Sequence, residues 1–274
     1  MMNISVGYYT DEGDVKKENQ DSVFVKKKYT DNGQIGLFIV ADGCGGMKFG
    51  DKISRLTVSH FSKMWNEESE NLAEPGTDDC LINDMLERTI KKINSEAVHF
   101  SEQVNSNVGS TLSLILVADG KYYIKNIGDS RVYVKRGRKL VRLTEDQTLM
   151  ADMLRNGELT RKEAKDFKKK NVLTMCIGMF DEVRFFSRKG RIKNNDVFLV
   201  CSDGLYNSIE ESEIVKIINN RKIPFEDKCR KIREKIEFGK ARDNVSLVLC
   251  KCSTDGSFAQ LKKLMAKYAA KNND

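Results

Sequence analysis

The sequence of 274 residues has only two histidines, His60 and His99, and none of its seven cysteines belongs to a Cys-x-x-Cys pair. Zinc sites are built from clustered thiols and imidazoles, so this scattered set argues against one. The cysteine count is odd, and several cysteines lie within apolar runs, which is typical of small buried side chains in a reducing compartment. We therefore expect free thiols and no structural zinc.

Long hydrophobic segments are also missing. No apolar run approaches the ~20 residues that a membrane-spanning helix requires, and the polar N-terminus does not resemble a signal peptide. There is no internal repeat, linker or low-complexity tract. These absences predict a cytoplasmic protein that does not contact a membrane.

The charge is moderately basic, with 47 lysines and arginines against 40 acidic residues, a net +7. A basic surface can attract nucleic acid, but the chain has no nucleic-acid-binding motif and no interleaving of aromatic and basic residues. A solvated, mixed-charge surface is the simpler interpretation. With 40% hydrophobic residues, the chain can also bury a substantial core.

Short apolar runs bounded by turn residues alternate with segments of helical periodicity. Asp31-Asn32-Gly33 and Asp119-Gly120 are strong hairpin signals. Strands are expected at 1–9, 22–26, 36–40, 110–118, 121–127, 131–134, 140–143, 196–202 and 245–250, and helices at 51–65, 81–98, 212–219 and 225–236. This pattern predicts an α+β fold in which helices cover antiparallel sheets.

Two segments fall outside this pattern. Residues 148–178 are charged, carry a helical pattern with little apolar surface, and include the capping-box sequence Thr160-Arg161-Lys162-Glu163. We expect them to form a mobile excursion from the core. Residues 253–274 are lysine-rich and have helical spacing, so the predicted organisation is one domain over 1–252 followed by a basic helical tail.

Five aspartates share one feature, because each lies where an apolar strand begins or ends: Asp21, Asp42, Asp129, Asp203 and Asp243. A single aspartate in such a place is most often a turn or cap residue. If the five strand ends share one rim, however, the carboxylates repel and raise one another's pKa unless cations neutralise them. An oxygen-only ligand set selects Mg²⁺ or Mn²⁺. Two such ions can activate a water and stabilise displacement at phosphorus, so the residues predict a metal-dependent phosphoryl hydrolase.

The order of the motifs resembles the PP2C (PPM) family of protein serine/threonine phosphatases, bacterial type. The resemblance runs from about Ser5 to Cys252 and rests on seven short motifs in the family's order: Asn19-Gln20-Asp21, Asp42-Gly43-x-Gly45-Gly46, Gly109-Ser110-Thr111, Gly128-Asp129-Ser130-Arg131, Leu143-Thr144-x-Asp146, Ser202-Asp203-Gly204-Leu205 and Asp243-Asn244. It implies a four-layer α/β/β/α sandwich, two antiparallel sheets flanked by helix pairs, with 148–178 as the flap.

The resemblance also implies site roles. Asp42 would bridge two Mn²⁺ or Mg²⁺ ions, and the Gly43 carbonyl and Asp21 would serve the second ion. Asp203 and Asp243 would hold the first. Asp129 matches the position that helps to bind a third, weaker ion in bacterial relatives; its simpler alternative is a turn stabiliser paired with Arg131.

Three positions depart from the family pattern. Lys16 stands where relatives carry an arginine that grips the substrate phosphate, which keeps the charge but loses the planar bidentate geometry. Cys44 stands where animal relatives have a histidine proposed as the general acid, so a metal-bound water would take that role, and a catalytic thiol is the weaker alternative. In the family's Leu-Thr-x-Asp-His sequence, Gln147 stands in place of the histidine; Asp146 and Gln147 are expected to be structural and to tie down the loop before the flap.

The predicted activity is hydrolysis of phosphoserine and phosphothreonine in proteins by a metal-bridging water. The substrates would be products of a serine/threonine kinase, an inference from the habit of the family, and the enzyme is expected to be a monomer. Two alternatives stay open. One is a weakly active or inactive phosphoprotein-binding regulator, which only Lys16 favours, and the other is a hydrolase of small phosphoesters or nucleic acid.

Overall fold

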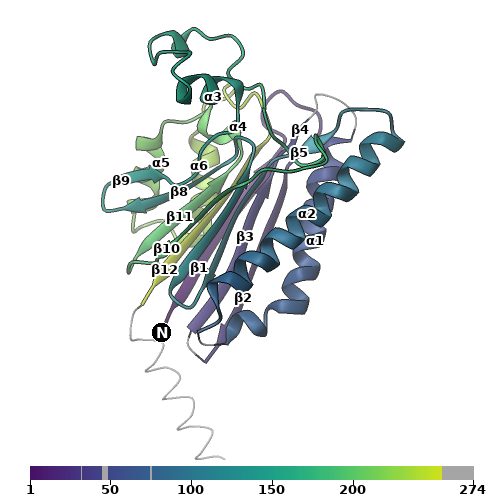
Figure 1. Cartoon of the computed structure of the whole chain (residues 1–274). Coiled ribbons are helices and arrows are strands. Elements are labelled where there is room, and N and C mark those ends of the chain that lie inside the picture. Colours follow the sequence, from purple (N-terminus) through teal and green to yellow (C-terminus); the bar gives the residue numbers. More distant parts are fainter. Residues whose placement is uncertain (32, 45–48, 75, 255–274) are drawn as a thin grey trace, which may run out of the picture.

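The computed structural model describes residues 1–31, 33–44, 49–74 and 76–254. Two five-stranded antiparallel sheets pack face to face, and helices cover the outer face of each (Figure 1). The predicted four-layer arrangement is therefore confirmed. Within the described part of the chain, no helix is both long and apolar enough to cross a bilayer.

The first sheet has the strand order β10-β7-β6-β3-β2. Its central strands are entirely or almost entirely buried, because both of their faces are covered. The strands are β2 (Ser22–Thr30), β3 (Gly33–Ala41), β6 (Leu112–Ala118), β7 (Lys121–Ile127) and β10 (Phe186–Arg191).

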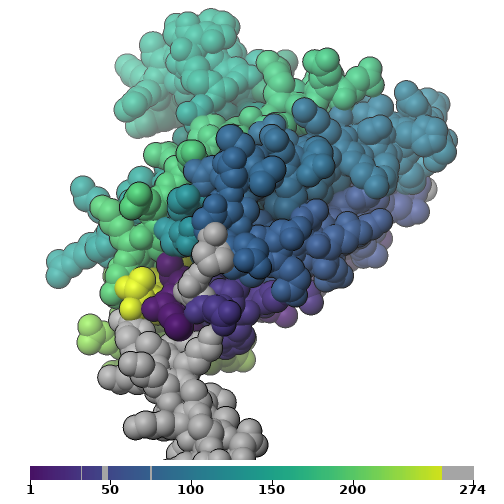
Figure 2. Space-filling view, turned by 60° about the horizontal axis from the view of Figure 1, so that its bottom comes forward, coloured from purple at the N-terminus to yellow at the C-terminus, as the bar shows by residue number. Residues whose placement is uncertain are grey.

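The second sheet has the order β1-β12-β11-β8-β9. The first and last long strands of the chain pair with each other, from Asn3 opposite Ser253 to Asp11 opposite Val245. Figure 2 shows the start of the chain (purple) beside the end of β12 (yellow). The strands are β1 (Asn3–Asp11), β8 (Arg131–Arg136), β9 (Lys139–Arg142), β11 (Asp196–Cys201) and β12 (Val245–Ser253).

Three apolar clusters hold the layers together. One lies between the first sheet and helices α1 (Gly50–Glu68) and α2 (Asp79–Gln103), with a short 3-10 turn, η1 (Asn71–Ala73), between them. The second fills the space between the sheets, and the third lies under α5 (Glu211–Asn219), η3 (Phe225–Asp227) and α6 (Lys228–Lys235). Burial of this apolar surface is the main source of stability.

The flap leaves the sandwich after Gln147 and stands away from it in Figure 1. It contains α3 (Leu149–Arg155), which buries no residue, and the short η2 (Glu163–Lys165). Thr160 and Glu163 form the reciprocal bonds of a capping box, as predicted, although the element is a 3-10 turn. The predicted tail, 253–274, lies outside the described residues beyond Thr254.

Strand β10 was not predicted from the sequence pattern. The β10 sequence, Phe-Ser-Arg-Lys-Gly-Arg, has almost no apolar alternation, yet it pairs with β7 from Phe186 opposite Asn126 to Arg191 opposite Lys121. It is an edge strand whose side chains are mostly exposed, so it lacks the apolar run that indicates the inner strands.

Candidate metal centre and active site

Strand register brings the five strand-end aspartates to one end of the sandwich. In the first sheet Ser22 pairs with Ala41, which places Asp21 and Asp42 side by side just beyond the pair. In the second sheet Cys201 lies between Arg131 and Leu247, so Asp129, Asp203 and Asp243 follow or precede that row. Asp203 is the first residue of the short helix α4 (Asp203–Tyr206).

Hydrogen bonds across the gap join the two sheets at this end. The Ser202 hydroxyl donates to Asp21 Oδ2 at 2.8 Å, and the backbone N–H of Gln20 donates to Asn244 Oδ1 at 2.9 Å. The second oxygen of Asp21, Oδ1, is buried and accepts no hydrogen bond. A buried carboxylate oxygen without a donor is costly in isolation, and a cation satisfies it.

Burial and the charges of neighbouring carboxylates raise the pKa of four of these aspartates. Burial, followed by the charges of Asp203 and Asp243, raises the pKa of Asp21 to about 6. Burial and the charge of Asp243 raise the pKa of Asp203 to about 6, and burial and the charge of Asp203 raise the pKa of Asp129 to about 7. The pKa of Asp42 is raised well above its ordinary value by burial and then by the other four carboxylates. Like charges this close favour the binding of a cation.

The aspartate side chains do not by themselves complete the coordination of a metal ion. Among the described residues, no group of three or more His, Cys, Asp or Glu side chains is gathered closely enough to hold one ion. Mg²⁺ and similar hard ions, however, are usually bound by one or two carboxylates and keep several waters. The all-oxygen donor set, the bare Asp21 oxygen and the crowded charges therefore fit divalent ions of this class.

Gly43 lies where no side chain can be accommodated. A Cβ on Gly43 would lie 2.5 Å from the carbonyl oxygen of Gly50 and 2.6 Å from that of Gln20. Its backbone is thus pressed between the start of α1 and the residue before Asp21. Asp42 itself is anchored to Thr111, whose hydroxyl accepts from the Asp42 N–H at 3.1 Å and whose N–H donates to the Asp42 carbonyl at 2.8 Å.

The Lys16 ammonium lies 2.9 Å from Asp243 Oδ1, so this side chain reaches one of the five aspartates. Both side chains are about half exposed, at 48% and 46%, so the pair is open to solvent. The segment that carries Lys16 is held by Asn244, whose amide donates to the carbonyls of Glu12 and Glu18. The sequence motif Asp243-Asn244 contains this residue, but its positioning role is apparent only in the structure.

Arg131 pairs with Asp146 and not with Asp129, so the alternative proposed for Asp129 was wrong about its partner. Two guanidinium nitrogens of Arg131 donate to the two Asp146 oxygens at 3.0 and 2.7 Å. The guanidinium also stacks 3.5 Å above the ring of Tyr206, whose hydroxyl donates to the Asp129 carbonyl at 3.1 Å. Tyr206 was missed by the sequence analysis, although it closely follows Asp203.

The expected structural role of Asp146 and Gln147 is confirmed. Gln147 Oε1 accepts from the Gly128 N–H, and its Nε2 donates to the Arg184 carbonyl. Because Gly128 precedes Asp129, this side chain connects the start of the flap to the turn that carries Asp129.

Cys44 does not have the properties of a nucleophile. A hydrogen bond with Cys176, then burial and the nearby carboxylates, raise the pKa of the Cys44 thiol well above its ordinary value. Nucleophilic cysteines have the opposite shift. The remaining glycines of the motif, Gly45 and Gly46, lie outside the described residues.

Comparison with known proteins agrees with this geometry. The sequence pattern of the family described as protein phosphatase 2C matches residues 14–237. The chain belongs to the protein phosphatase 2C family. Membership confirms the predicted resemblance, and the chain is a protein phosphatase.

Relatives are similar over almost their whole length. The chain is 32% identical over 246 residues to a protein named serine/threonine phosphatase stp from Listeria monocytogenes, covering 88% of this chain and 93% of that protein. It is 28% identical over 250 residues to protein phosphatase PhpP from Streptococcus pneumoniae, covering 90% and 96%. A solved catalytic domain of the serine/threonine phosphatase PstP, in complex with two manganese ions, superposes with a TM-score of 0.74 at 26% identity, covering 92% of this chain and 100% of that one.

Proposed function

We propose that this phosphatase hydrolyses phosphoserine and phosphothreonine in proteins with two Mn²⁺ or Mg²⁺ ions held at the strand-end aspartates. Five carboxylates at one end of the sandwich, one of which has a buried oxygen without a donor, are the observation that supports this assignment. Bound ions would activate a water as nucleophile and neutralise charge on the phosphate. The manganese complex of the PstP neighbour agrees with this ion class.

The proposed residue roles are those that the family resemblance implies. Asp42 would contact both ions, and Gly43 would offer its carbonyl beside it; the charges of the other four carboxylates raise the pKa of Asp42. Asp21 would hold one ion through its bare Oδ1, and Asp203 and Asp243 would hold the other. Asp129, whose carboxylate is coupled most strongly to that of Asp203, would bind a third and weaker ion.

Lys16 would contact the Asp243 carboxylate before the ions bind and the substrate phosphate afterwards. Without ligand its ammonium pairs with Asp243, and when an ion neutralises Asp243 the ammonium becomes free to contact a substrate phosphate. A lysine makes this contact as a point charge, without the bidentate geometry of arginine. Binding of substrate is therefore weaker than in a relative with arginine, but the chemistry is retained.

The substrates are expected to be phosphoproteins made by a serine/threonine kinase, and the enzyme to be monomeric and cytoplasmic. The alternative of an inactive phosphoprotein-binding regulator rests on Lys16 alone and is not favoured by the named phosphatase relatives.

The deciding experiment is Mn²⁺-dependent release of phosphate from a phosphothreonine peptide. The wild-type protein should be active, and Asp42→Ala and Asp203→Ala should each lose at least about 100-fold in kcat/KM while remaining folded. Glu145→Ala, a change at an exposed acid near the flap, is the control. No phosphate release with any divalent ion, or full activity in Asp42→Ala, contradicts the proposal.

A further inference from the structure

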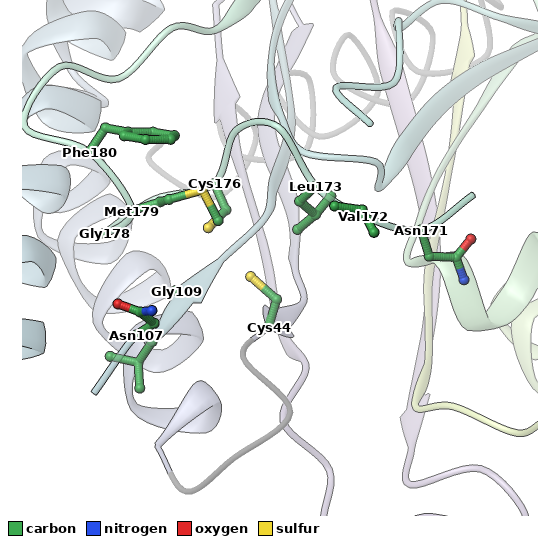
Figure 3. A pocket seen from close by; sticks show the side chains of 11 residues that line it. Cys44, Asn107, Gly109, Asn171, Val172, Leu173, Cys176, Gly178, Met179 and Phe180 are labelled. Carbon is green, nitrogen blue, oxygen red and sulfur yellow. The ribbon is translucent and has the colours of Figure 1, made fainter. Parts of the chain in front are cut away.

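Three sulfur-containing side chains line one cavity between the chain that follows Asp42 and the end of the flap. The cavity has a volume of about 720 Å³, and its lining includes Cys44, Cys176 and Met179. Figure 3 shows Cys44 pointing from the loop after Asp42 toward the chain segment that carries the other two residues. We refer to these three residues as the sulfur cluster.

A glycine allows the two thiols to approach each other. A Cβ built on Gly109 would lie 2.6 Å from the Cys176 sulfur and 3.5 Å from the Cys44 sulfur, so these sulfurs lie within about 6 Å of each other. Gly109 pairs with Cys44 across the small β4–β5 ladder, in which β4 is Gly43–Cys44 and β5 is Gly109–Ser110. The other residue of β5, Ser110, forms an antiparallel backbone bridge with Ile177, the residue after Cys176. Both sulfurs therefore lie close to Gly109, which has no side chain to separate them.

A tight turn brings the backbone of Met179 close to that of Cys176, and the side chains of both residues line the cavity. The N–H of Met179 donates to the Cys176 carbonyl at 3.4 Å, and Gly178 has φ +85°. This is the backbone of a type II turn, whose first and fourth residues lie within 7 Å between their Cα atoms. The turn is held to α2 by Asn94, which accepts from the Gly178 N–H at 2.9 Å and donates to the Phe180 carbonyl at 2.8 Å. The backbone that carries Cys176 and Met179 is therefore held in place before any ligand arrives, while Met179 itself is 44% exposed.

We propose that Cys44, Cys176 and Met179 form a binding site for a soft monovalent ion, Cu⁺, in the cleft next to the oxygen-lined metal centre. Thiolate and thioether sulfurs select Cu⁺, whereas the carboxylates of the neighbouring centre select hard ions. Zinc would need a fourth protein ligand or imidazole support, and both histidines lie on the helices, where His60 contacts Glu96 and His99 contacts Gln103.

Binding is a ligand exchange without electron transfer. Cu⁺ replaces the protons of the Cys44 and Cys176 thiols, which pass to the buffer, and the Met179 thioether donates a lone pair without losing a proton. Copper stays in the +1 state throughout. The bound ion joins the residue after Gly43 to the end of the flap, so we expect it to inhibit the phosphatase, a consequence that rests on the proposed function.

The test measures binding directly, so it does not depend on enzymatic activity. Full-length protein is titrated anaerobically with Cu⁺ against a chromophoric Cu⁺ chelator. The wild-type protein should bind one ion with an affinity that falls by at least about 100-fold in Cys176→Ala and in Cys44→Ala, since losing even an outer-shell partner costs 10- to 100-fold. Met179→Leu, which keeps the apolar volume, should lose about 10-fold.

Cys80→Ala is the matched control, because Cys80 is an exposed thiol at the start of α2. Its affinity for Cu⁺ should equal that of the wild-type protein. Equal affinity in Cys176→Ala and wild type, a loss in Cys80→Ala as large as in Cys176→Ala, or Zn²⁺ binding as tight as Cu⁺ binding overturns the site. Thermal unfolding of Cys176→Ala, with Cys176→Ser as a second variant, verifies that the comparison is made on folded protein.

Inhibition is then measured in the Mn²⁺-dependent assay. One equivalent of Cu⁺ should reduce phosphate release by the wild-type enzyme by at least about 10-fold and leave Cys176→Ala unaffected. Equal inhibition of both proteins overturns the link between the sulfur cluster and the catalytic cleft. An inactive enzyme that still binds Cu⁺ through the cluster contradicts the proposed function and leaves the site standing.

Discussion

Replacing Asp146 by asparagine should destabilise the protein far more than the loss of an exposed acidic residue does. The Asp146 side chain is 10% exposed, and it accepts two hydrogen bonds from Arg131 and one from Arg142 at 3.0 Å. The Arg131 side chain is 19% exposed, so the Asp146→Asn variant removes the carboxylate that is paired with a largely buried guanidinium. The charges of Asp129 and Asp203 still act on that guanidinium. Breaking a buried pair from one side typically costs about 3–5 kcal/mol.

The remaining contacts of Arg131 place the expected loss at the lower end of that range. Its guanidinium still meets the Tyr133 hydroxyl at 3.1 Å and the face of the Tyr206 ring. We therefore expect a loss of about 3 kcal/mol in the free energy of unfolding, which corresponds to a fall in Tm of about 6–12 °C for a domain of this size. Urea denaturation and thermal unfolding of the metal-free protein measure both quantities.

Glu145→Gln provides the comparison. The neighbouring pair between Arg155 and Glu145 has side chains that are 46% and 60% exposed. Exposed pairs contribute about 0–1 kcal/mol, so this variant should change Tm by no more than about 2–4 °C. Equal shifts in Tm for Asp146→Asn and Glu145→Gln would refute the reasoning, because burial would then not determine the cost.

Three further predictions concern the phosphate contact, the dependence on pH and the bound ions. Lys16→Arg should raise kcat/KM about 10-fold toward a phosphothreonine peptide, mainly through KM, because a guanidinium binds phosphate bidentately; an unchanged KM contradicts this role. The Tyr123 hydroxyl, then Lys121 and Lys189, hold the pKa of Asp79 well below its ordinary value. Its stabilising effect is therefore complete above pH ~4 and is lost as the pH falls further, so the urea midpoint of the wild-type protein should drop more steeply below pH 4 than that of Asp79→Asn; parallel curves exclude the contribution. Mn²⁺ at 100 times its dissociation constant should stabilise the folded protein by about 2.7 kcal/mol, and chelation should remove this gain; the same gain in Asp42→Ala contradicts the assignment of that ligand.

Much of the fold was predictable because it depends on burial. The inner strands β3, β6 and β11 are mostly apolar and buried along their whole length, and the covering helices α1 and α2 have apolar residues at helical spacing. Both patterns are visible in the chain without knowledge of its partners. The edge strand β10 was missed because its partner β7 supplies the hydrogen bonds while its own side chains stay exposed.

The sequence indicated which residues belong to the candidate site, but not which of them contact one another. Strand-end position and motif order identified the five aspartates and Lys16. They did not identify Ser202, which donates to Asp21 from the other sheet, or Tyr206, which connects Arg131 to the turn of Asp129. Such contacts depend on register and on the distance between sheets, which short-range sequence patterns do not encode.

The pairing of Arg131 illustrates the difference. Arg131 lies two positions after Asp129 and fifteen positions before Asp146. The alternation of side chains along a strand and the path of the loop after β9 bring Asp146 to the guanidinium instead. Proximity in sequence therefore suggested the wrong partner.

By itself the sequence determined the family, the α+β architecture and the identity of the acidic residues, because these depend on composition, periodicity and the order of motifs. Only the tertiary structure decided which residues meet. The β4–β5 ladder brings Cys44 against Gly109, and the turn at Gly178 brings Cys176 and Met179 to the same cavity. Residues from three distant segments thus converge because the β4–β5 ladder and the bridge between Ser110 and Ile177 set their separation, and no local pattern in the chain carries that information.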